Sequence, residues 1–223
     1  MRERRGMASF LGIYQLADCA KLLHAPRETV REWTVKGLAP SRKKGQRISP
    51  PSYNFADLVS LLVVRELRRR GIPLQRIRKA EEYLRGIEGF DRPLATKRLY
   101  TAGRDILFRL AAEEDHGTHL VAATRGGQTA IEEAFESVLS AVHYDEQIAS
   151  YWLPWEDVQV TPERQFGAPC VFGTGIQTAT LYGFYQAGDQ PEFIAQLYSL
   201  PLERVERAIA WENSLASQEA KAA

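Results

Sequence analysis

Apolar residues recur at helical spacing near the start of the chain. Leu16, Cys19, Ala20 and Leu23 stand at i, i+3, i+4 and i+7, a pattern that predicts an amphipathic helix over residues 15–23. The apolar face of this helix is narrow. It therefore needs a neighbouring helix to cover it.

A second helix is expected after a break at residues 24–26. Pro26 suits its first position, where a missing N–H costs nothing, and Gly37 stands where a left-handed C-terminal cap is favoured. The residues expected to pack on the first helix are Val30, Trp33 and Leu38. Those left to face outward are Arg27, Thr29, Arg31 and Lys36. Such a pair is a helix-turn-helix, whose second helix can enter the major groove of DNA. An ordinary helical hairpin with a solvated basic face is the alternative.

Two further helices follow the next polar stretch. Asn54 is a suitable N-cap for a helix over residues 55–70, which Gly71 ends, and another helix is expected over residues 73–85. The inward residues of the first are Leu58, Leu61, Leu62 and Val64. Its last turn carries Arg68, Arg69 and Arg70. Cations there suit the helix dipole, so phosphate contact by this cluster is a secondary interpretation.

The pattern changes to short, partly alternating runs in the middle of the chain. Runs at 97–100, 106–110 and 119–123 predict a β-hairpin or small sheet. Residues 113–117, Glu-Glu-Asp-His-Gly, carry possible metal ligands. A solvated turn is favoured over a metal site there, because consecutive ligands in a turn seldom converge on one ion.

A double glycine at residues 126–127 precedes the next periodic run. It predicts a tight turn rather than a phosphate-binding loop, because the Lys-Ser/Thr of such loops is missing. A helix is then expected over residues 129–141, with inward residues Ile131, Phe135, Val138 and Leu139. Strands are expected at 142–144, 150–153 and 158–160. Their aromatic residues suit core packing, with a dimer surface as the alternative.

Three short helices are expected at the C-terminal side, over residues 180–186, 191–198 and 201–214. The last of them has Leu202, Val205, Ile209 and Trp211 to pack. The predicted fold class is therefore mainly α with a small β-rich middle, an α+β protein. The predicted domains are a winged helix-turn-helix (12–86), a central β-rich or dimerisation segment (94–160) and a helical domain resembling a second helix-turn-helix (161–216).

Charge is distributed unevenly along the chain. The net charge is only +1, but residues 1–79 hold 18 Lys and Arg against 6 Asp and Glu, and the remainder holds 11 against 22. Four cations, Arg42, Lys43, Lys44 and Arg47, surround a single glycine after the second helix, as in a β-hairpin wing that lies along phosphates. The basic part points to nucleic acid. The acidic part suits either a basic protein partner or simple solubility.

Several classes of function have little support. No apolar run approaches the roughly 18 residues of a membrane span, and no signal peptide is convincing, so a cytoplasmic location without membrane contact is expected. Cys19 and Cys170, the 2 cysteines, lack metal-ligand spacing and suit reduced packing residues. The 4 histidines show no nucleophile or paired-base spacing, and no Gly-rich cofactor loop is present. An enzyme, a cofactor and a metal are therefore not expected.

The N-terminal part resembles the MerR-type winged-helix family. The matching residues are Thr29, Val30, Arg31, Trp33, Gly37, Leu38, Pro40, Arg42, Arg47, Tyr53, Asp57, Leu58, Leu67, Gly71, Ile72, Leu74 and Ile77. In that family the recognition helix leads into a wing and then a helix pair. Metal- and drug-sensing members continue into a coiled-coil dimer helix, whereas Gly86, Gly89 and Pro93 interrupt the pattern here.

The C-terminal part resembles a small bacterial domain family of unknown function. The matching residues are Gly167, Pro169, Val171, Gly173, Thr174, Ile176, Ala187, Gly188, Asp189, Ile194, Ala195, Leu202, Val205 and Ala208. An arginine that usually follows Gly-Thr is Gly175 in this chain. Domains of this family often belong to antitoxins encoded beside PIN-type ribonuclease toxins, the VapB–VapC arrangement.

The two resemblances together imply a type II antitoxin that binds operator DNA as a homodimer, represses its own operon and neutralises a PIN-domain ribonuclease. Residues Arg27, Thr29 and Arg31 are expected to read base edges, Lys36 to face the DNA, and Arg42, Lys43, Lys44 and Arg47 to bind phosphates. The alternative is a stand-alone MerR-like regulator that senses a small ligand in the middle or C-terminal segment.

Overall fold

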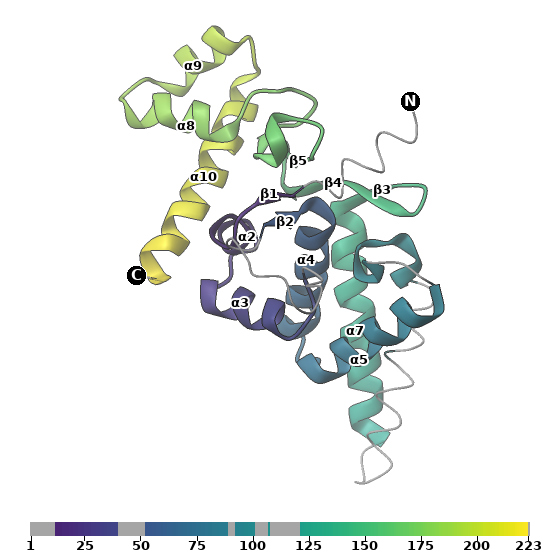
Figure 1. The fold of residues 1–223 in the computed structure, drawn as a ribbon. Helices are drawn as coiled ribbons and strands as arrows, with labels where there is room; N and C mark the ends of the chain where they lie inside the picture. The colour runs from purple at the N-terminus through teal and green to yellow at the C-terminus, as the bar shows by residue number, and fades with distance from the viewer. Residues whose placement is uncertain (1–11, 40–51, 89–91, 101–106, 108–120, 223) are drawn as a thin grey trace.

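The computed structural model describes residues 12–39, 52–88, 92–100, 107 and 121–222. The helices are α2 (Leu16–Leu22), α3 (Arg27–Val35), α4 (Phe55–Arg69), α5 (Leu74–Glu88), α7 (Val121–Ala141), α8 (Thr178–Gln186), α9 (Pro191–Tyr198) and α10 (Leu202–Ala222), with 3-10 turns η1 (Pro93–Ala95), η2 (Lys97–Tyr100) and η3 (Gln165–Gly167). The strands are β1 (Gly12–Tyr14), β2 (Tyr53–Asn54), β3 (Val142–Asp145), β4 (Ile148–Trp155), β5 (Val158–Val160) and β6 (Cys170–Val171). Helices thus dominate around a small sheet (Figure 1), and the expected α+β class is confirmed.

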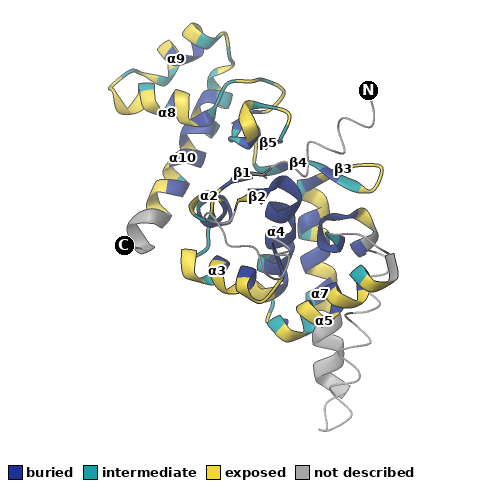
Figure 2. Ribbon diagram, viewed as in Figure 1, coloured by how far each residue is buried: buried dark blue, intermediate teal, exposed yellow. Residues whose placement is uncertain are grey.

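Helix α4 is the centre of the larger core. It is buried along nearly its whole length (Figure 2), and α7, η1 and strands β2 and β4 pack against it. Its N-terminus is closed by a capping box, in which the Asn54 side chain accepts from the Asp57 N–H at 2.7 Å and Asp57 accepts from the Asn54 N–H at 3.0 Å. The predicted cap at Asn54 is therefore confirmed. Residues 55–64 of α4 are all buried, and a helical segment buried on every side needs covering elements all round.

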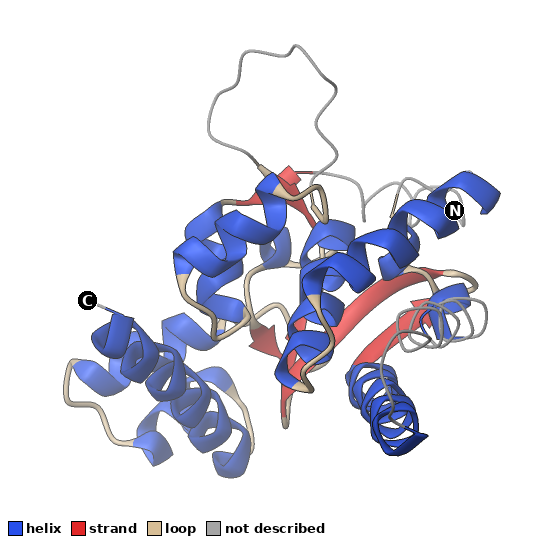
Figure 3. Cartoon of the chain, turned by 90° about the horizontal axis from the view of Figure 1, so that it is seen from below, coloured by secondary structure: helices blue, strands red, loops and turns tan. Residues whose placement is uncertain are grey.

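Four antiparallel strands form the sheet in the order β3–β4–β5–β6. Val142 pairs with Trp152, Trp152 with Val160, and Val158 with Val171. Seen from below, the sheet curves beside the central helices (Figure 3). The first three strands were predicted. The last was not, because two residues are too few to show an alternating pattern.

The described residues form two hydrophobic cores. The larger core runs from Tyr14 through α4 and the sheet to Val160, and also includes Trp211 and Leu215 of α10. The smaller core lies among α8, α9 and the first half of α10, which stand at one end of the molecule (Figure 1). Helix α10 therefore contributes to both cores. The three domain ranges from the sequence stay a prediction.

Several helix ends lie at the proline, asparagine or glycine residues from which the sequence predicted them. Helix α9 begins at Pro191 as expected, and Gly37, Gly71 and Gly188 have φ of +88°, +83° and +104° after α3, α4 and α8. Each of these glycines stands where an L side chain would be strained. The C-terminal three-helix prediction is confirmed, although α8 begins at Thr178 rather than at residue 180 and α10 continues to Ala222 rather than ending at residue 214.

The predicted strand at residues 97–100 is wrong. Lys97–Tyr100 is a 3-10 turn, in which the Leu99 N–H donates to the Thr96 carbonyl at 3.1 Å. Leu99 and Tyr100 are both buried, although neighbours on a strand point to opposite faces. Of the other two runs in this region, only residue 107 and residues 121–123 lie within the described residues, and all of these are helical, so the strand prediction is wrong there too. The turn at 113–117 lies outside them.

The double glycine is not a turn, because helix α7 begins at Val121 and continues through residues 126–127. Glycine costs roughly 1 kcal/mol in a helix interior, so propensity alone would end the helix there. Packing outweighs that cost: Ile131, Ala134 and Val138 of α7 are buried in the larger core beside α4. Leu139, expected inward, is 40% exposed, because it stands at the edge of this stripe.

Candidate nucleic-acid interface

Helices α2 and α3 form the expected helix-turn-helix. The chain turns between them at His24, whose φ is +47°. The Ala25 N–H donates to the Ala20 carbonyl at 3.0 Å, so the turn satisfies the last carbonyls of α2. Pro26 is the N-cap of α3 rather than its first residue, a shift of one position. The interruption of the apolar pattern at residues 24–26 therefore predicted this turn correctly.

A cluster of charged groups on α4 holds the turn in place. Arg65 donates to Glu66 through Nε at 2.9 Å and Nη2 at 2.6 Å, and to the Leu23 carbonyl through Nη1 at 3.0 Å. Arg70 donates to the other Glu66 oxygen at 2.7 Å. Burial alone would raise the pKa of the Glu66 carboxyl, but Arg65 and Arg70 outweigh it and lower that pKa. Glu66 is therefore ionised and fixes Arg65 under the end of α2.

Helix α3 is anchored by its buried face. Val30, Trp33 and Thr34 are buried, and the Thr34 hydroxyl lies 2.9 Å from the Tyr53 hydroxyl and donates to the Val30 carbonyl at 3.0 Å. Leu38 is also buried, as predicted. The rest of α3 is thereby turned away from the core. This arrangement presents one long side of a short, rigid helix to solvent.

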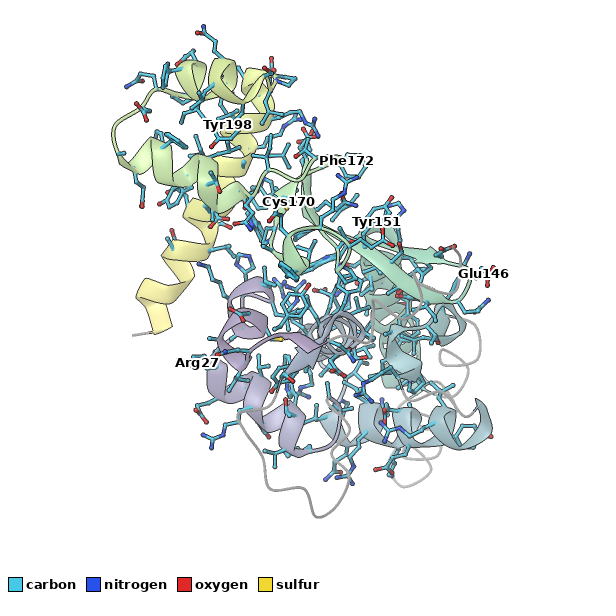
Figure 4. All side chains as sticks on the ribbon, turned by 45° about the horizontal axis from the view of Figure 1, so that its top comes forward. Arg27, Glu146, Tyr151, Cys170, Phe172 and Tyr198 are labelled. Atoms are coloured by element: carbon cyan, nitrogen blue, oxygen red, sulfur yellow. The ribbon has the colours of Figure 1, made fainter. Side chains whose placement is uncertain are left out.

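The predicted contact residues of α3 lie on two edges of that exposed side. Arg27 and Arg31 are exposed and one turn apart on one edge, and Arg27 lies at the outer surface of the molecule (Figure 4). Lys36 is exposed on the other edge, where Thr29 is half-buried. Arg27, Arg31 and Lys36 thus face outward as expected, whereas Thr29 does so only in part. Their contacts with DNA stay a prediction.

Two acidic residues share this face and pair with its cations. Glu28 lies 3.6 Å from Arg31, and Glu32 contacts Lys36. The hydrogen bond and charge of Lys36 lower the pKa of Glu32 below its usual value. Exposed pairs of this kind contribute little to stability. Arg31 and Lys36 can therefore exchange their carboxylate partners for phosphate or base acceptors at small cost.

Val35 is a surface residue of α3 that the sequence reasoning did not single out. Its side chain is 73% exposed in the middle of the outward side. Helical spacing could have found it, because Val35 lies opposite the stripe made by Val30, Trp33 and Thr34. An exposed apolar group on a recognition helix can contact the methyl group of thymine.

A groove continues the basic surface from α3 onto α4 and α5. Its volume is about 770 Å³. Its lining residues are His24, Ala25, Pro26, Thr29, Glu32, Trp33, Lys36, Arg65, Arg68, Arg69, Pro73, Leu74 and Gln75. Arg69 has 69% of its side chain exposed. Two of the three arginines that the sequence assigned mainly to the helix dipole, Arg68 and Arg69, thus lie beside the predicted DNA face.

The predicted wing cannot be placed. Arg42, Lys43, Lys44 and Arg47 lie outside the described residues. Ser52 begins the described chain after this gap, and Tyr53 then pairs with Tyr14 of β1.

Other predicted features of the chain concern metals, thiols and membranes. Among the described residues no group of three or more His, Cys, Asp or Glu side chains is gathered as a metal would require. Cys19 and Cys170 are free and buried, and burial raises the pKa of both thiols. None of the helices in the described part combines the length and apolar character needed to cross a membrane.

Comparison with known proteins identifies both ends of the chain. Residues 14–84 match the MerR HTH family of regulatory proteins, and residues 158–211 match a family described as protein of unknown function, DUF433. The chain therefore carries a MerR-type helix-turn-helix domain at its N-terminal side and a DUF433 domain at its C-terminal side.

Two curated proteins and one crystal structure, all from Mycobacterium tuberculosis, are similar over most of the chain. One named "Putative antitoxin VapB45" is 28% identical, covering 88% of this chain and 92% of its own. "Uncharacterized protein Rv2308" is 25% identical and covers 94% of each chain. A crystal structure of Rv2018 has a TM-score of 0.73 and 25% identity, covering 90% of this chain and 99% of that one. The likeness thus extends well beyond the helix-turn-helix.

Proposed function

We propose that this protein is a sequence-specific DNA-binding antitoxin of a type II toxin–antitoxin pair, which represses its own operon as a homodimer and neutralises a PIN-type ribonuclease. The observation that carries the proposal is the exposed face of α3, held rigidly by Arg65, Glu66 and Tyr53 within a MerR-type domain. The antitoxin-like relative over most of the chain supports the second half of the proposal.

In this mechanism the exposed side of α3 enters the major groove. Arg27, Thr29 and Arg31 read base edges, and Lys36 turns from Glu32 to a phosphate. The wing cations Arg42, Lys43, Lys44 and Arg47 add phosphate contacts along the backbone. A homodimer would present two such helices, so its operator needs two half-sites about 34 Å apart or a multiple of that distance.

The partner-binding surface is proposed to lie on the C-terminal helices. Tyr185 of α8 and Phe193 and Leu197 of α9 are 42%, 53% and 53% exposed. Exposed apolar side chains near acidic residues such as Glu192 suit a protein partner with a basic, RNA-binding face. In the acidic part of the chain this surface offers apolar contact together with favourable charge.

The deciding experiment is fluorescence anisotropy on the DNA upstream of the gene, across a salt series, with and without the product of the neighbouring gene. The proposal is supported by tight, sequence-dependent binding whose affinity falls steeply with salt concentration and changes when the partner is added. The double variant Phe193→Ser/Leu197→Ser should bind DNA as tightly as the parent protein, but adding the partner should no longer change that binding. Tyr83→Ser, on the exposed side of α5, is the matched control. Absence of DNA binding would overturn the proposal.

A stand-alone regulator that senses a small ligand is the second candidate. It is favoured by a cavity of about 230 Å³ among the central sheet, α7 and α10. DNA binding that is unaffected by the neighbouring gene product, but altered by a small molecule, would favour this candidate over the antitoxin.

A further inference from the structure

The exposed side of α3 has a central ridge that carries no cation. Each residue of an α-helix is turned by about 100° from the one before it. Measured from the middle of the stripe that α3 buries, Glu28, Glu32 and Val35 lie within roughly 35° of the opposite direction. Arg31 and Lys36 lie roughly 70° from that direction, on the two flanks. The side chains that point most directly out of the protein are therefore two carboxylates and one apolar group.

The three side chains of this central ridge are accessible. Those of Glu28 and Glu32 are 81% and 54% exposed, and Val35 is 73% exposed. Glu28 stands in the first turn of α3, where a negative charge also suits the helix dipole. Glu32 stands in the middle of the helix, where the dipole gives it no such role. A second acidic residue on the same ridge therefore needs another explanation.

Cations border the central ridge on both sides. Arg31 lies on one flank, and on the other Lys36 lines the groove that also contains Arg68 and Arg69 of α4. The major groove of DNA is about 12 Å wide, and a phosphate strand borders it on each side. A helix with cations on both flanks is attracted to both strands, which turns its central ridge toward the base edges between them. The carboxylates are then held as far from the phosphates as the groove allows.

Both carboxylates need new hydrogen-bond donors once DNA is bound. Glu28 is 3.6 Å from Arg31, and Glu32 contacts Lys36. In the mechanism proposed above, Arg31 turns to a base edge and Lys36 to a phosphate. An unpaired carboxylate in the negatively charged groove costs affinity, so a donor on a base edge must replace each cation. Cytosine presents only its N4 amino donor there, whereas adenine places the N7 acceptor beside its amino group and so repels a carboxylate.

We propose that Glu28 and Glu32 are specificity-determining residues, each accepting a hydrogen bond from the N4 amino group of a cytosine, and that Val35 contacts the methyl group of a thymine. The inference rests on the proposed DNA-binding function. Glu28 and Val35 stand seven residues apart, a span that covers about three consecutive base pairs in zinc-finger helices. Each half-site therefore contains two C·G pairs and one T·A pair within about that length. The carboxylates add discrimination, because a base with an acceptor at these places is rejected.

The test first selects the preferred DNA of the full chain from a random library, and then measures fluorescence anisotropy on the selected site and its single-base variants. Changing a contacted C·G pair to A·T should weaken binding of the parent protein roughly tenfold. Glu28→Gln and Glu32→Gln should each reverse this preference at one base pair, because glutamine pairs with N6 and N7 of adenine. Binding to random DNA should stay equal or become tighter, because a negative charge is removed.

Glu82→Gln on α5 is the matched control for both substitutions. Glu82 also pairs with an arginine of its own helix, Arg78 at 3.5 Å, and it lies beyond the residues of α5 that line the groove. This variant should keep every base preference of the parent. Deoxyuridine in place of the contacted thymine isolates the methyl group: it should weaken binding of the parent but not of Val35→Ala. If deoxyuridine costs nothing at any position, the Val35 contact is overturned.

Failure of this inference is distinguishable from failure of the proposed function. A parent protein that binds all DNA alike would overturn the DNA-binding function itself. If the parent selects a site but Glu28→Gln and Glu32→Gln keep its base preferences, the inference alone is overturned. A uniform gain in affinity for all sequences overturns it as well, because the carboxylates would then only repel DNA.

Discussion

Arg31 stands on the exposed side of α3 in contact with a carboxylate rather than free. Its guanidinium is 3.6 Å from Glu28, one turn earlier on the same helix. Both side chains are well exposed, so water screens the pair and the fold hardly depends on it. The role proposed for Arg31 can therefore be tested without disturbing the core.

Arg31→Ala should reduce discrimination at one base pair of the operator by roughly 1–3 kcal/mol and leave binding to random DNA almost unchanged. The reason is that a base-edge contact contributes only on the correct sequence. Anisotropy on the operator and on its single-base variants measures this. Arg78→Ala, on exposed α5, is the control, and an equal loss on operator and random DNA would remove Arg31 from the base-reading role.

Glu66 provides a pH-dependent contribution to stability. Its pKa is lowered in the folded protein: burial opposes ionisation, but the charges and hydrogen bonds of Arg65 and Arg70 prevail. A carboxyl whose folded pKa lies below its unfolded value stabilises the protein above the unfolded pKa, about 4.5, and loses that contribution as pH falls through the folded pKa.

Glu66→Gln should therefore lower the free energy of unfolding by about 3–5 kcal/mol at pH 7, because the change leaves buried Arg65 without its carboxylate. The difference between variant and parent should shrink as the pH falls below the folded pKa. Urea unfolding at pH 7 and at stepwise lower pH values measures both quantities. A difference that stays constant with pH would show that the carboxylate charge is not responsible, and Glu82→Gln on exposed α5 provides the comparison.

Helix α4 is stabilised both by a local capping box and by packing against elements distant in the sequence. Asn54 and Asp57 cap it reciprocally, and α7, η1, β2 and β4 pack against its buried sides. Asn54→Ala should cost about 1 kcal/mol in the free energy of unfolding, because an N–H in the first turn of α4 loses its acceptor. Thermal unfolding of the variant and the parent protein measures this loss of stability. Gln190→Ala at the start of α9, where no side-chain cap bond is made, should be nearly neutral.

Helices whose ends carry a capping or breaking residue could be predicted from the sequence, whereas a helix that depends on packing against distant parts of the chain could not. Pro191, Gly37 and Asn54 mark helix ends because their backbone or side-chain chemistry acts locally. Helix α7 passes through a double glycine because its buried stripe packs beside α4, a contact far apart in sequence. The same limit applies to the site: the outward residues of α3 follow from periodicity, but the pairing of Arg31 with Glu28 and the cavity at Trp211 do not.

The two cores of the molecule are joined by one helix. Val205, Ala208 and Ile209 of α10 lie in the smaller core, and Trp211 and Leu215 lie in the larger one. A second link runs from the Tyr14 hydroxyl to the Gly167 carbonyl at 3.2 Å. Changes in the C-terminal helices are therefore expected to reach the DNA-binding unit.

Trp211→Ala should lower the free energy of unfolding by about 3–5 kcal/mol, because it empties a large buried volume. Amide hydrogen exchange should also become faster in α2 and α3, far from the substitution in sequence. Glu206→Ala on the exposed side of α10 is the control. Faster exchange confined to α8–α10 would mean that the helix-turn-helix is stable without this contact.

Trp211 and Leu215 follow Val205, Ala208 and Ile209 along α10, so shortening the chain would affect the two cores in a fixed order. A protease that shortens the chain from its C-terminal side removes these two anchors before it reaches Ile209, Ala208 or Val205. The larger core beneath α3 thus loses its anchors on α10 first. Helix α8 also loses its hydrogen bonds to Glu212 and Asn213, but the apolar core that α8 and α9 form with Val205, Ala208 and Ile209 remains. If the C-terminal helices hold the toxin, a shortened protein would release its operator and allow resynthesis while the toxin is still restrained.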